Sequence, residues 1–254
     1  MKRFPILPAW IATALFSAAV HAQTTLNVYG PGGPAPVMKE AAAAFQKKTG
    51  VSVSVTAGPT PTWISKAKDD ADIIYSGSET MMSDFVDAMG DQLTPNAPEP
   101  LYLRPMAMLV RPGNPMHIRR FTDLLKPGVK ILVVNGAGQN GVWEDVAGRL
   151  GSIAQVKALR SNIVGYAKNS AEAKTTWTDH PESNVWLIWN IWQVANPSLA
   201  DVVPIKSAYA IYRDAGAAIT RLGADQPASR QFVDFLESKE GAAIFRKWGW
   251  KTDP

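Results

Sequence analysis

Residues 26–45 read LNVYGPGGPAPVMKEAAAAF and pass from one periodicity to another through a turn of glycine and proline. The alternating apolar residues of 25–30 predict a β-strand. Apolar residues then recur at helical spacing, and Gly50 supplies a stop signal, so a helix is predicted over 35–49. A strand that enters a helix through a short turn is typical of α/β domains, and this stretch therefore decides the fold class.

The same alternation continues along the chain. A strand pattern rich in β-branched residues covers 51–58, a short helical pattern covers 62–70, and a third strand covers 71–77. The most uniformly apolar segment of the later sequence, VKILVVN at 129–135, predicts a buried strand. Strands that alternate with helices through short connections predict parallel sheets with right-handed crossovers.

A proline-rich segment divides the pattern. Residues 93–100 read LTPNAPEP, and breakers at this density predict a linker or a crossing between lobes. The late strand pattern at 208–219 is suited to carry the chain back. We therefore predict two lobes, one from 23–100 with 207–254 and one from 101–206. Each lobe is expected to be a mainly parallel sheet flanked by helices, with a ligand cleft between them.

The first 22 residues have the features of a secretory signal peptide. A basic start with Lys2 and Arg3 precedes an apolar stretch, and small residues end it at Ala22, before Gln23. A membrane anchor is the alternative, but the apolar run is short for a span of about 20 residues and its end resembles a cleavage site. We expect cleavage after Ala22, no membrane insertion afterwards, and a soluble periplasmic protein that starts at Gln23.

Composition excludes several classes of function. The formal net charge of +4 includes the two cations of the leader, so the exported chain carries only a small positive excess. No basic run with interleaved aromatic residues is present, which argues against nucleic acid as a partner. The chain contains no cysteine, so it has no disulfides and depends on its hydrophobic core for stability.

Four loops of similar chemistry follow the predicted strands. They come after Tyr29, Val55, Tyr75 and Val134, and each is built from Gly, Pro, Ser, Thr or Asn ahead of a helical segment. Ligands of open α/β sheets bind beyond the carboxyl ends of the strands, where helix N-termini present free N–H groups. In one such loop glycine and proline are ordinary turn residues, but four loops at one sheet edge favour an anion cradle.

The opening turn illustrates this cradle. Gly32 and Gly33 lack a Cβ, so an anion can approach their backbone N–H groups closely without help from a cationic side chain.

Enzymatic and cofactor chemistry finds little support. Residues 136–141 match the dinucleotide fingerprint G-x-G-x-x-G, but no acidic residue follows at the required distance of about 20 residues. Beyond the leader the only histidines are His117 and His180, and no nucleophile–base motif accompanies them. We predict no catalytic residues, no metal site and no cofactor.

The tryptophans allow two interpretations. Trp186, Trp189 and Trp192 recur at three-residue spacing, which is typical of core packing. The functional interpretation places Trp189, just before Asn190, in the cleft. Trp63 and Trp143 each begin a helical segment after one of the four loops, so they are candidates to cover the site.

These segments resemble a known family. The chain is similar to type 2 periplasmic solute-binding proteins of the molybdate and sulfate group, and within it to the accessory colonization factor C (AcfC) family. The resemblance rests on VYGPGGPAPVMKEAAAAFQKKTG at 28–50, TAGPTPTWISKAK at 56–68, DADIIYSGSETMM at 70–82 and AAIFRKWGW at 242–250. It implies two α/β lobes, a monomer, and a tetrahedral oxyanion held between the lobes by neutral donors.

The resemblance also implies ligand-binding residues. They are Gly32 and Gly33 in the first loop, Thr60 and Thr62 in the second, Ser76 and Ser78 in the third, Asn140 and Gly141 in the second lobe, and Trp189 with Asn190. Trp63 joins this set because of its position after the second loop, and not through the resemblance. The pair of Trp189 and Asn190 replaces a tyrosine found in many molybdate-binding relatives. Because tryptophan has no hydroxyl, this departure argues against molybdate itself.

The expected function is that of an exported binding protein for a sulfate-like oxyanion or a small sulfo-conjugate. Such a protein delivers its ligand to the membrane permease of an ABC transporter or to a chemoreceptor. Two alternatives remain open: an adhesin or interaction protein for sulfated glycans, and an enzyme on the same fold.

Overall fold

The structure is a computed structural model and describes residues 25–253. The predicted signal peptide and the predicted mature start at Gln23 lie outside the described residues. Within residues 25–253, no helix combines the length and the apolarity that a membrane crossing requires.

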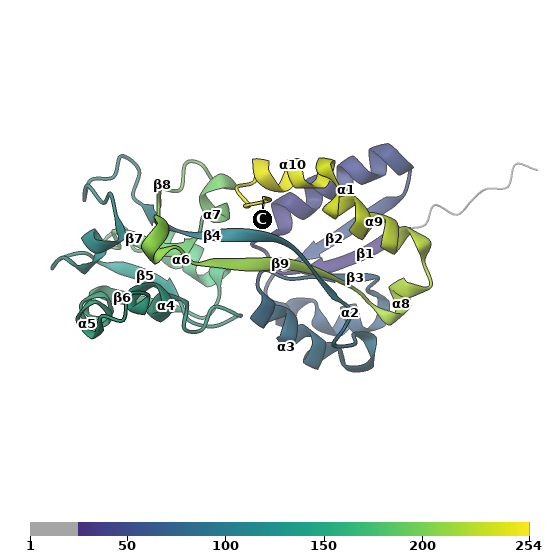
Figure 1. The fold of residues 1–254 in the computed structure, drawn as a ribbon, viewed down its shortest axis with the longest axis horizontal. Coiled ribbons are helices and arrows are strands. Elements are labelled where there is room, and N and C mark those ends of the chain that lie inside the picture. The colour runs from purple at the N-terminus through teal and green to yellow at the C-terminus, as the bar shows by residue number, and fades with distance from the viewer. Residues whose placement is uncertain (1–24, 254) are drawn as a thin grey trace, which may run out of the picture.

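The first lobe opens with the predicted strand–helix alternation (Figure 1). Helix α1 begins at Ala35 and ends at Thr49, as predicted, and Gly50 closes it with a left-handed φ of 79°. Strand β1 pairs in parallel with β2 on one side and β3 on the other. The elements are β1 (Thr25–Gly30), α1 (Ala35–Thr49), β2 (Ser52–Ala57), η1 (Thr60–Thr62), α2 (Ile64–Asp70), β3 (Ile73–Tyr75), α3 (Glu79–Met89) and η2 (Gly90–Gln92).

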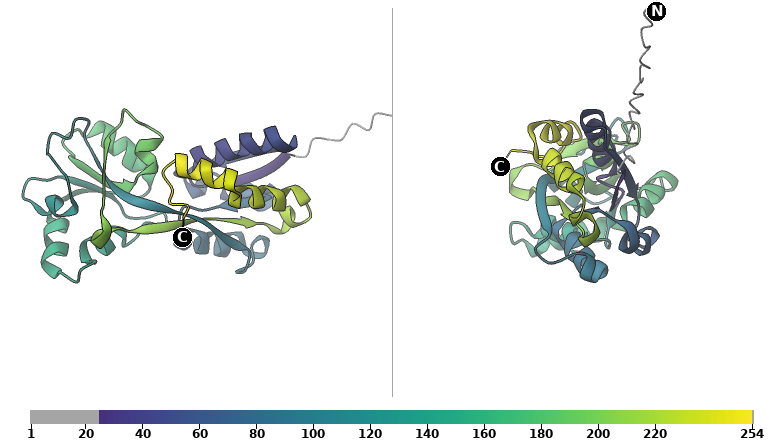
Figure 2. Two further views of the ribbon diagram at one scale, coloured as in Figure 1. Left: turned by 45° about the horizontal axis from the view of Figure 1, so that its top comes forward. Right: turned by 90° about the vertical axis from the view of Figure 1, so that its right-hand side faces the viewer.

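Two antiparallel strands connect the lobes. Strand β4 (Pro98–Val110) pairs with β9 (Tyr212–Ile219) through its residues 98–105 and with strands of the second lobe through 106–110. Both strands run along the long axis of the molecule from one lobe into the other (Figures 1 and 2). Each sheet is mainly parallel, as predicted, and contains one reversed strand that crosses between the lobes. That strand is β9 in the first lobe and β4 in the second.

The second lobe repeats the arrangement around β5, which pairs in parallel with β6 and β7. Its elements are η3 (Phe121–Leu125), β5 (Ile131–Val134), α4 (Val142–Gly148), α5 (Ile153–Asn162), β6 (Ile163–Ala167), α6 (Ser170–Asp179), β7 (Val185–Trp189), α7 (Ile191–Val194), β8 (Asp201–Pro204) and η4 (Ser207–Tyr209). The strand predicted at 129–135 is β5, and all four of its residues are buried.

The chain returns to the first lobe through β9 and ends in α8 (Arg221–Ala224), α9 (Pro227–Glu237) and α10 (Lys239–Lys247). Helices α9 and α10 lie beside α1 on one face of the sheet, while α2 and α3 lie on the other (Figure 1). Phe45 of α1 contacts Phe232 and Phe235 of α9 at ring distances of 5.2 and 5.6 Å. The lobe boundaries at 100 and 207 stay a prediction, which the crossing of β4 and β9 near these positions supports.

Gly30, the last residue of β1, allows a close approach of two backbone segments. A Cβ at this position would lie 2.5 Å from the carbonyl oxygen of Tyr75, at the end of β3. That separation is below van der Waals contact, so a side chain here must push β1 and β3 apart. This contact holds in register the two strands whose ends lead into the first and third loops.

We expect Gly30→Ala to destabilise the fold by about 1–3 kcal/mol through overpacking. The melting temperature should fall by roughly 3–10 °C. Gly148→Ala is the matched control, because its Cβ would meet only ordinary contact with Val156 at 3.7 Å. Equal melting temperatures for the two variants would contradict this role of Gly30.

Candidate functional site

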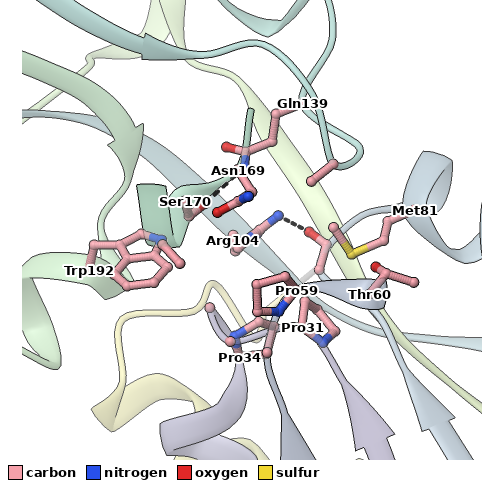
Figure 3. A pocket seen from close by; sticks show the side chains of 16 residues that line it. Pro31, Pro34, Pro59, Thr60, Met81, Arg104, Gln139, Asn169, Ser170 and Trp192 are labelled. Carbon is pink, nitrogen blue, oxygen red and sulfur yellow. Dashed lines mark hydrogen bonds between the residues drawn. The ribbon is translucent and has the colours of Figure 1, made fainter. Parts of the chain in front are cut away.

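A cavity of about 80 Å³ lies where loops from both lobes meet (Figure 3). Three loops of the first lobe line the cavity, together with one residue of the crossing strand β4 and several residues of the second lobe. Its lining is Pro31, Gly32, Gly33, Pro34, Gly58, Pro59, Thr60, Gly77, Met81, Arg104, Ala137, Gln139, Asn169, Ser170, Ala171 and Trp192. The loops that the sequence singled out after β1, β2, β3 and β5 all contribute to it.

Three of the eleven predicted ligand-binding residues line this cavity: Gly32, Gly33 and Thr60. Neither glycine is among the described residues with a left-handed φ. A Cβ on Gly33 would lie 3.3 Å from Nη1 of Arg104, which is a tight contact, and 3.9 Å from Nε1 of Trp192, which is an ordinary one. The turn thus brings the start of α1 against a cation.

The predicted residues of the second and third loops have structural contacts. Thr62 is exposed and donates its hydroxyl to the carbonyl of Pro59 at 2.8 Å. Trp63 is buried in the core of the first lobe, where its indole donates to the carbonyl of Gly58 at 3.2 Å. Ser76 is buried and accepts the backbone N–H of Gly216 on β9 at 3.3 Å.

Ser78 lies beside the cavity rather than in its lining. Its hydroxyl caps α3 by accepting the N–H of Met81 at 3.1 Å. The same hydroxyl donates to the carbonyl of Gly138 at 3.3 Å, which belongs to the second lobe. Ser78 is therefore a contact between the lobes.

The predicted residues of the second lobe also stand apart from the lining. Asn140 is exposed, and Gly141 precedes α4 with a left-handed φ of 75°. Trp189 is fully buried, and Asn190 donates its side-chain amide to the carbonyl of Gly249 at 2.8 Å. Trp143, predicted to cover the site, is buried against Tyr166 at a ring distance of 6.5 Å. Core packing describes these tryptophans better than a place in the cleft.

Arg104 corrects the expectation of a cradle made only of neutral groups. Its side chain comes from β4 at the crossing between the lobes, is 3% exposed, and faces the cavity (Figure 3). One Nη group donates to the carbonyl of Gly77, and the guanidinium carbon lies 4.2 Å from the centre of the Trp189 ring. Among the described residues, its Nε has no hydrogen-bond partner and no carboxylate forms a salt bridge with it.

Burial lowers the pKa of Arg104 to about 9, because desolvation disfavours the cation, while the nearby carboxylate of Glu79 opposes the shift. The guanidinium is still charged at neutral pH. A buried charge without a charged partner is costly, and an anion in the cavity would offset that cost. The site is therefore electrostatically complementary to an anion.

Helix N-termini add to this positive character. α1, α3 and α6 all begin at the lining, so the positive ends of their dipoles converge on the cavity. Asn169 caps α6 by accepting the backbone N–H of Glu172 at 2.9 Å, and Ser170 accepts the side-chain amide of Gln139 at the same distance. These hydrogen bonds fix the second-lobe wall before any ligand arrives.

Trp192 supplies a further donor. Its indole Nε1 is buried without a hydrogen-bond partner among the described residues, and the side chain lines the cavity. Its ring packs against Trp186 at a distance of 5.9 Å, which holds the indole in place. A rigid, unpaired donor beside a buried guanidinium can bind a second oxygen of an anionic group.

Two sequence signals pointed to the missed residues. Arg104 interrupts the apolar strand LYLRPMAMLV, and a buried arginine needs a partner. Trp192 lies three residues after Trp189 and continues the same spacing. The sequence does not show that the chain turns from β7 into α7 between them, and this turn places the ring of Trp192, and not that of Trp189, in the cavity lining.

Comparison with solved structures places the fold among two-lobed periplasmic binding proteins. PEB3 with L-phospholactate bound has 34% sequence identity and a TM-score of 0.85, with 90% of this chain and all of that chain covered. PEB3 of Campylobacter jejuni matches with a TM-score of 0.83 at the same identity and coverage.

More distant structures share the fold alone. The sulfate-binding protein SubI from Mycobacterium tuberculosis H37Rv has 18% identity, a TM-score of 0.73, and coverage of 91% of this chain and 88% of its own. The periplasmic molybdate-binding protein of Azotobacter vinelandii has 17% identity and a TM-score of 0.68, with 90% and 100% covered. Comparison with curated protein sequences found no match.

The fold and the cavity between its lobes define a solute-binding protein. Residues 26–251 match the bacterial extracellular solute-binding proteins, and the chain belongs to this family.

Substitution at Gly33 tests the contact between the first loop and Arg104. A Cβ in Gly33→Ala would press on Nη1 of Arg104, so we expect anion affinity to fall at least several-fold while the melting temperature changes by less than about 3 °C. Calorimetric titration and thermal melting measure the two quantities. Gly148→Ala changes a residue outside the lining and should leave the affinity unchanged, whereas unaltered binding by Gly33→Ala would contradict the role of this turn.

Proposed function

We propose that this chain is an exported solute-binding protein that captures a small anion in the cavity between its lobes. The observation that carries the proposal is Arg104, a buried guanidinium that faces the cavity without a carboxylate partner. Three helix N-termini and the indole of Trp192 surround the same space, and all of these groups favour negative charge.

The ligand class follows from these donors and from the relatives. PEB3 has been solved with L-phospholactate, a small molecule that carries two acidic groups. Walls from both lobes supply donors here, which suits a short molecule with an oxyanion group at one end and a second polar group at the other. Relatives named for sulfate and molybdate make bare oxyanions the competing ligands.

The biological setting is proposed by resemblance to the accessory colonization factor C family. The protein would work as a monomer in the periplasm and pass its ligand to a permease or a chemoreceptor. An enzyme is the weaker alternative, because the lining contains no His, Asp, Glu, Lys or Cys that would serve as general base or nucleophile. If the protein is instead an adhesin for sulfated glycans, the cavity should bind no small anion.

Arg104→Gln should abolish most anion binding. Removing one partner of a buried charged contact costs about 2–5 kcal/mol, which corresponds to an affinity loss of roughly 30-fold or more. Stability should be unchanged or higher, because the variant removes an uncompensated buried charge. Thermal shift and calorimetry with L-phospholactate, sulfate and molybdate measure both effects. A large loss of stability with affinity spared would instead give Arg104 a structural role through Gly77.

Trp192→Phe keeps the aromatic ring and removes its N–H donor. We expect roughly a 10-fold to 150-fold loss of affinity for the ligand that wild type prefers, since a hydrogen bond to a charged group contributes about 1.5–3 kcal/mol. Arg230→Gln, which changes a surface arginine of the first lobe, is the matched control for both variants. If wild type binds none of the three anions, the proposed function is wrong.

A further inference from the structure

Arg213 connects the two lobes through a pair of carboxylates. It lies on β9, directly opposite Arg104 in the antiparallel pairing of the crossing strands. Its Nη2 is 2.8 Å from Oδ2 of Asp145 on α4, in the second lobe. Its Nε is 3.4 Å from Oε1 of Glu79, the first residue of α3 in the first lobe. One side chain on a crossing strand thus contacts both lobes.

Each carboxylate belongs to an element that helps to form the cavity. Glu79 follows Gly77, whose carbonyl accepts from Arg104, and its second oxygen accepts the backbone N–H of Asp214 at 3.2 Å. Asp145 lies in the first turn of α4, directly after the loop at 135–141 that carries two lining residues. Moving the lobes apart therefore breaks at least one of the two ion pairs.

A second contact joins the two lobes in the same region. A Cβ on Gly138 would lie 2.9 Å from Cβ of Met81, so only a glycine lets the second-lobe loop approach α3 this closely. Ala137, its neighbour, holds a left-handed φ of 46° that is unusual for a residue with a side chain. The Gly136–Gly141 loop is thus shaped to meet α3 beside the Arg213 bridge.

We propose that Arg213, Glu79 and Asp145 form a latch that keeps the lobes closed and slows release of the bound anion. Arg213 is a positioning residue, since it acts by holding the two cavity loops together. The effect on ligand release rests on the proposed function, whereas the effect on lobe closure does not.

Simple electrostatics gives the opposite expectation, which makes the latch testable. Glu79 and Asp145 are negative charges near an anion site, so neutralising either should tighten anion binding by a Coulomb argument. The latch predicts weaker binding and faster dissociation for Asp145→Asn. The pairs are partly exposed to solvent, with side-chain exposures of 22% for Arg213 and 50% for Asp145, so the expected change is about twofold to fivefold.

Lobe closure is measured first, without ligand. The chain has no cysteine, so Lys47→Cys on α1 and Lys157→Cys on α5 place one spin label on each lobe of the exported protein. We expect Asp145→Asn and Glu79→Gln to shift the distance distribution between the labels toward longer distances. Arg230→Gln is the matched control, because Arg230 also bridges two carboxylates, Glu99 and Asp234, but both lie in the first lobe.

Dissociation of L-phospholactate is measured next on the same variants. A rate increased about twofold to fivefold by Asp145→Asn, with the control unchanged, supports the latch. Identical distance distributions in wild type and Asp145→Asn would overturn it, and so would tighter binding by the variant. If the distances shift but wild type binds no L-phospholactate, the latch stands and the proposed ligand class fails.

Discussion

A single uncompensated charge at the crossing of two strands organises this molecule. Strand β4 belongs to both sheets, and Arg104 lies near the point where its partners change from β9 to β7 and β8. A guanidinium at that point belongs to neither lobe and faces the loops of both. The hydrogen bond to the carbonyl of Gly77 and the contact with the face of Trp189 offset only part of the desolvation free energy of this cation. A negatively charged group in the cavity would offset more of it.

The surrounding structure keeps that charge accessible to a small ligand. Glycines at 33 and 77 allow the turn after β1 and the turn after β3 to approach the guanidinium, since a Cβ on either would lie 3.3 or 3.0 Å from its nitrogens. Proline at the start of α1 fixes the turn without losing a needed donor. The positive ends of α1 and α6 face the cavity from opposite lobes, and each adds a dipole without requiring another buried cation.

Local sequence patterns predicted most of the fold. The periodicity of 25–49 specified β1 and α1 closely, because an amphipathic pattern and a glycine stop are local properties. The antiparallel β4–β9 pairing was not specified, because it joins residues more than 100 positions apart and depends on tertiary contacts. The loops were found because glycine-rich turns before helices are also local. Their individual hydroxyls were harder to assign: Ser76 and Ser78 are as suitable for β9 pairing and helix capping as for a ligand.

The missed cation shows why site prediction needs the third dimension. In the sequence, Arg104 is one arginine among many Lys and Arg residues, and its significance arises only where β4 passes from one lobe to the other. The same holds for Arg213, which is opposite Arg104 yet has two carboxylates as partners. Of these two neighbouring arginines, the one that is paired connects the lobes and the one that is unpaired faces the cavity. If the cavity binds an anion as proposed, that anion pairs with Arg104, just as Glu79 and Asp145 pair with Arg213 in the closed arrangement. Occupancy and closure would then both reduce unpaired charge at the same crossing, which would couple ligand binding to the position of the lobes.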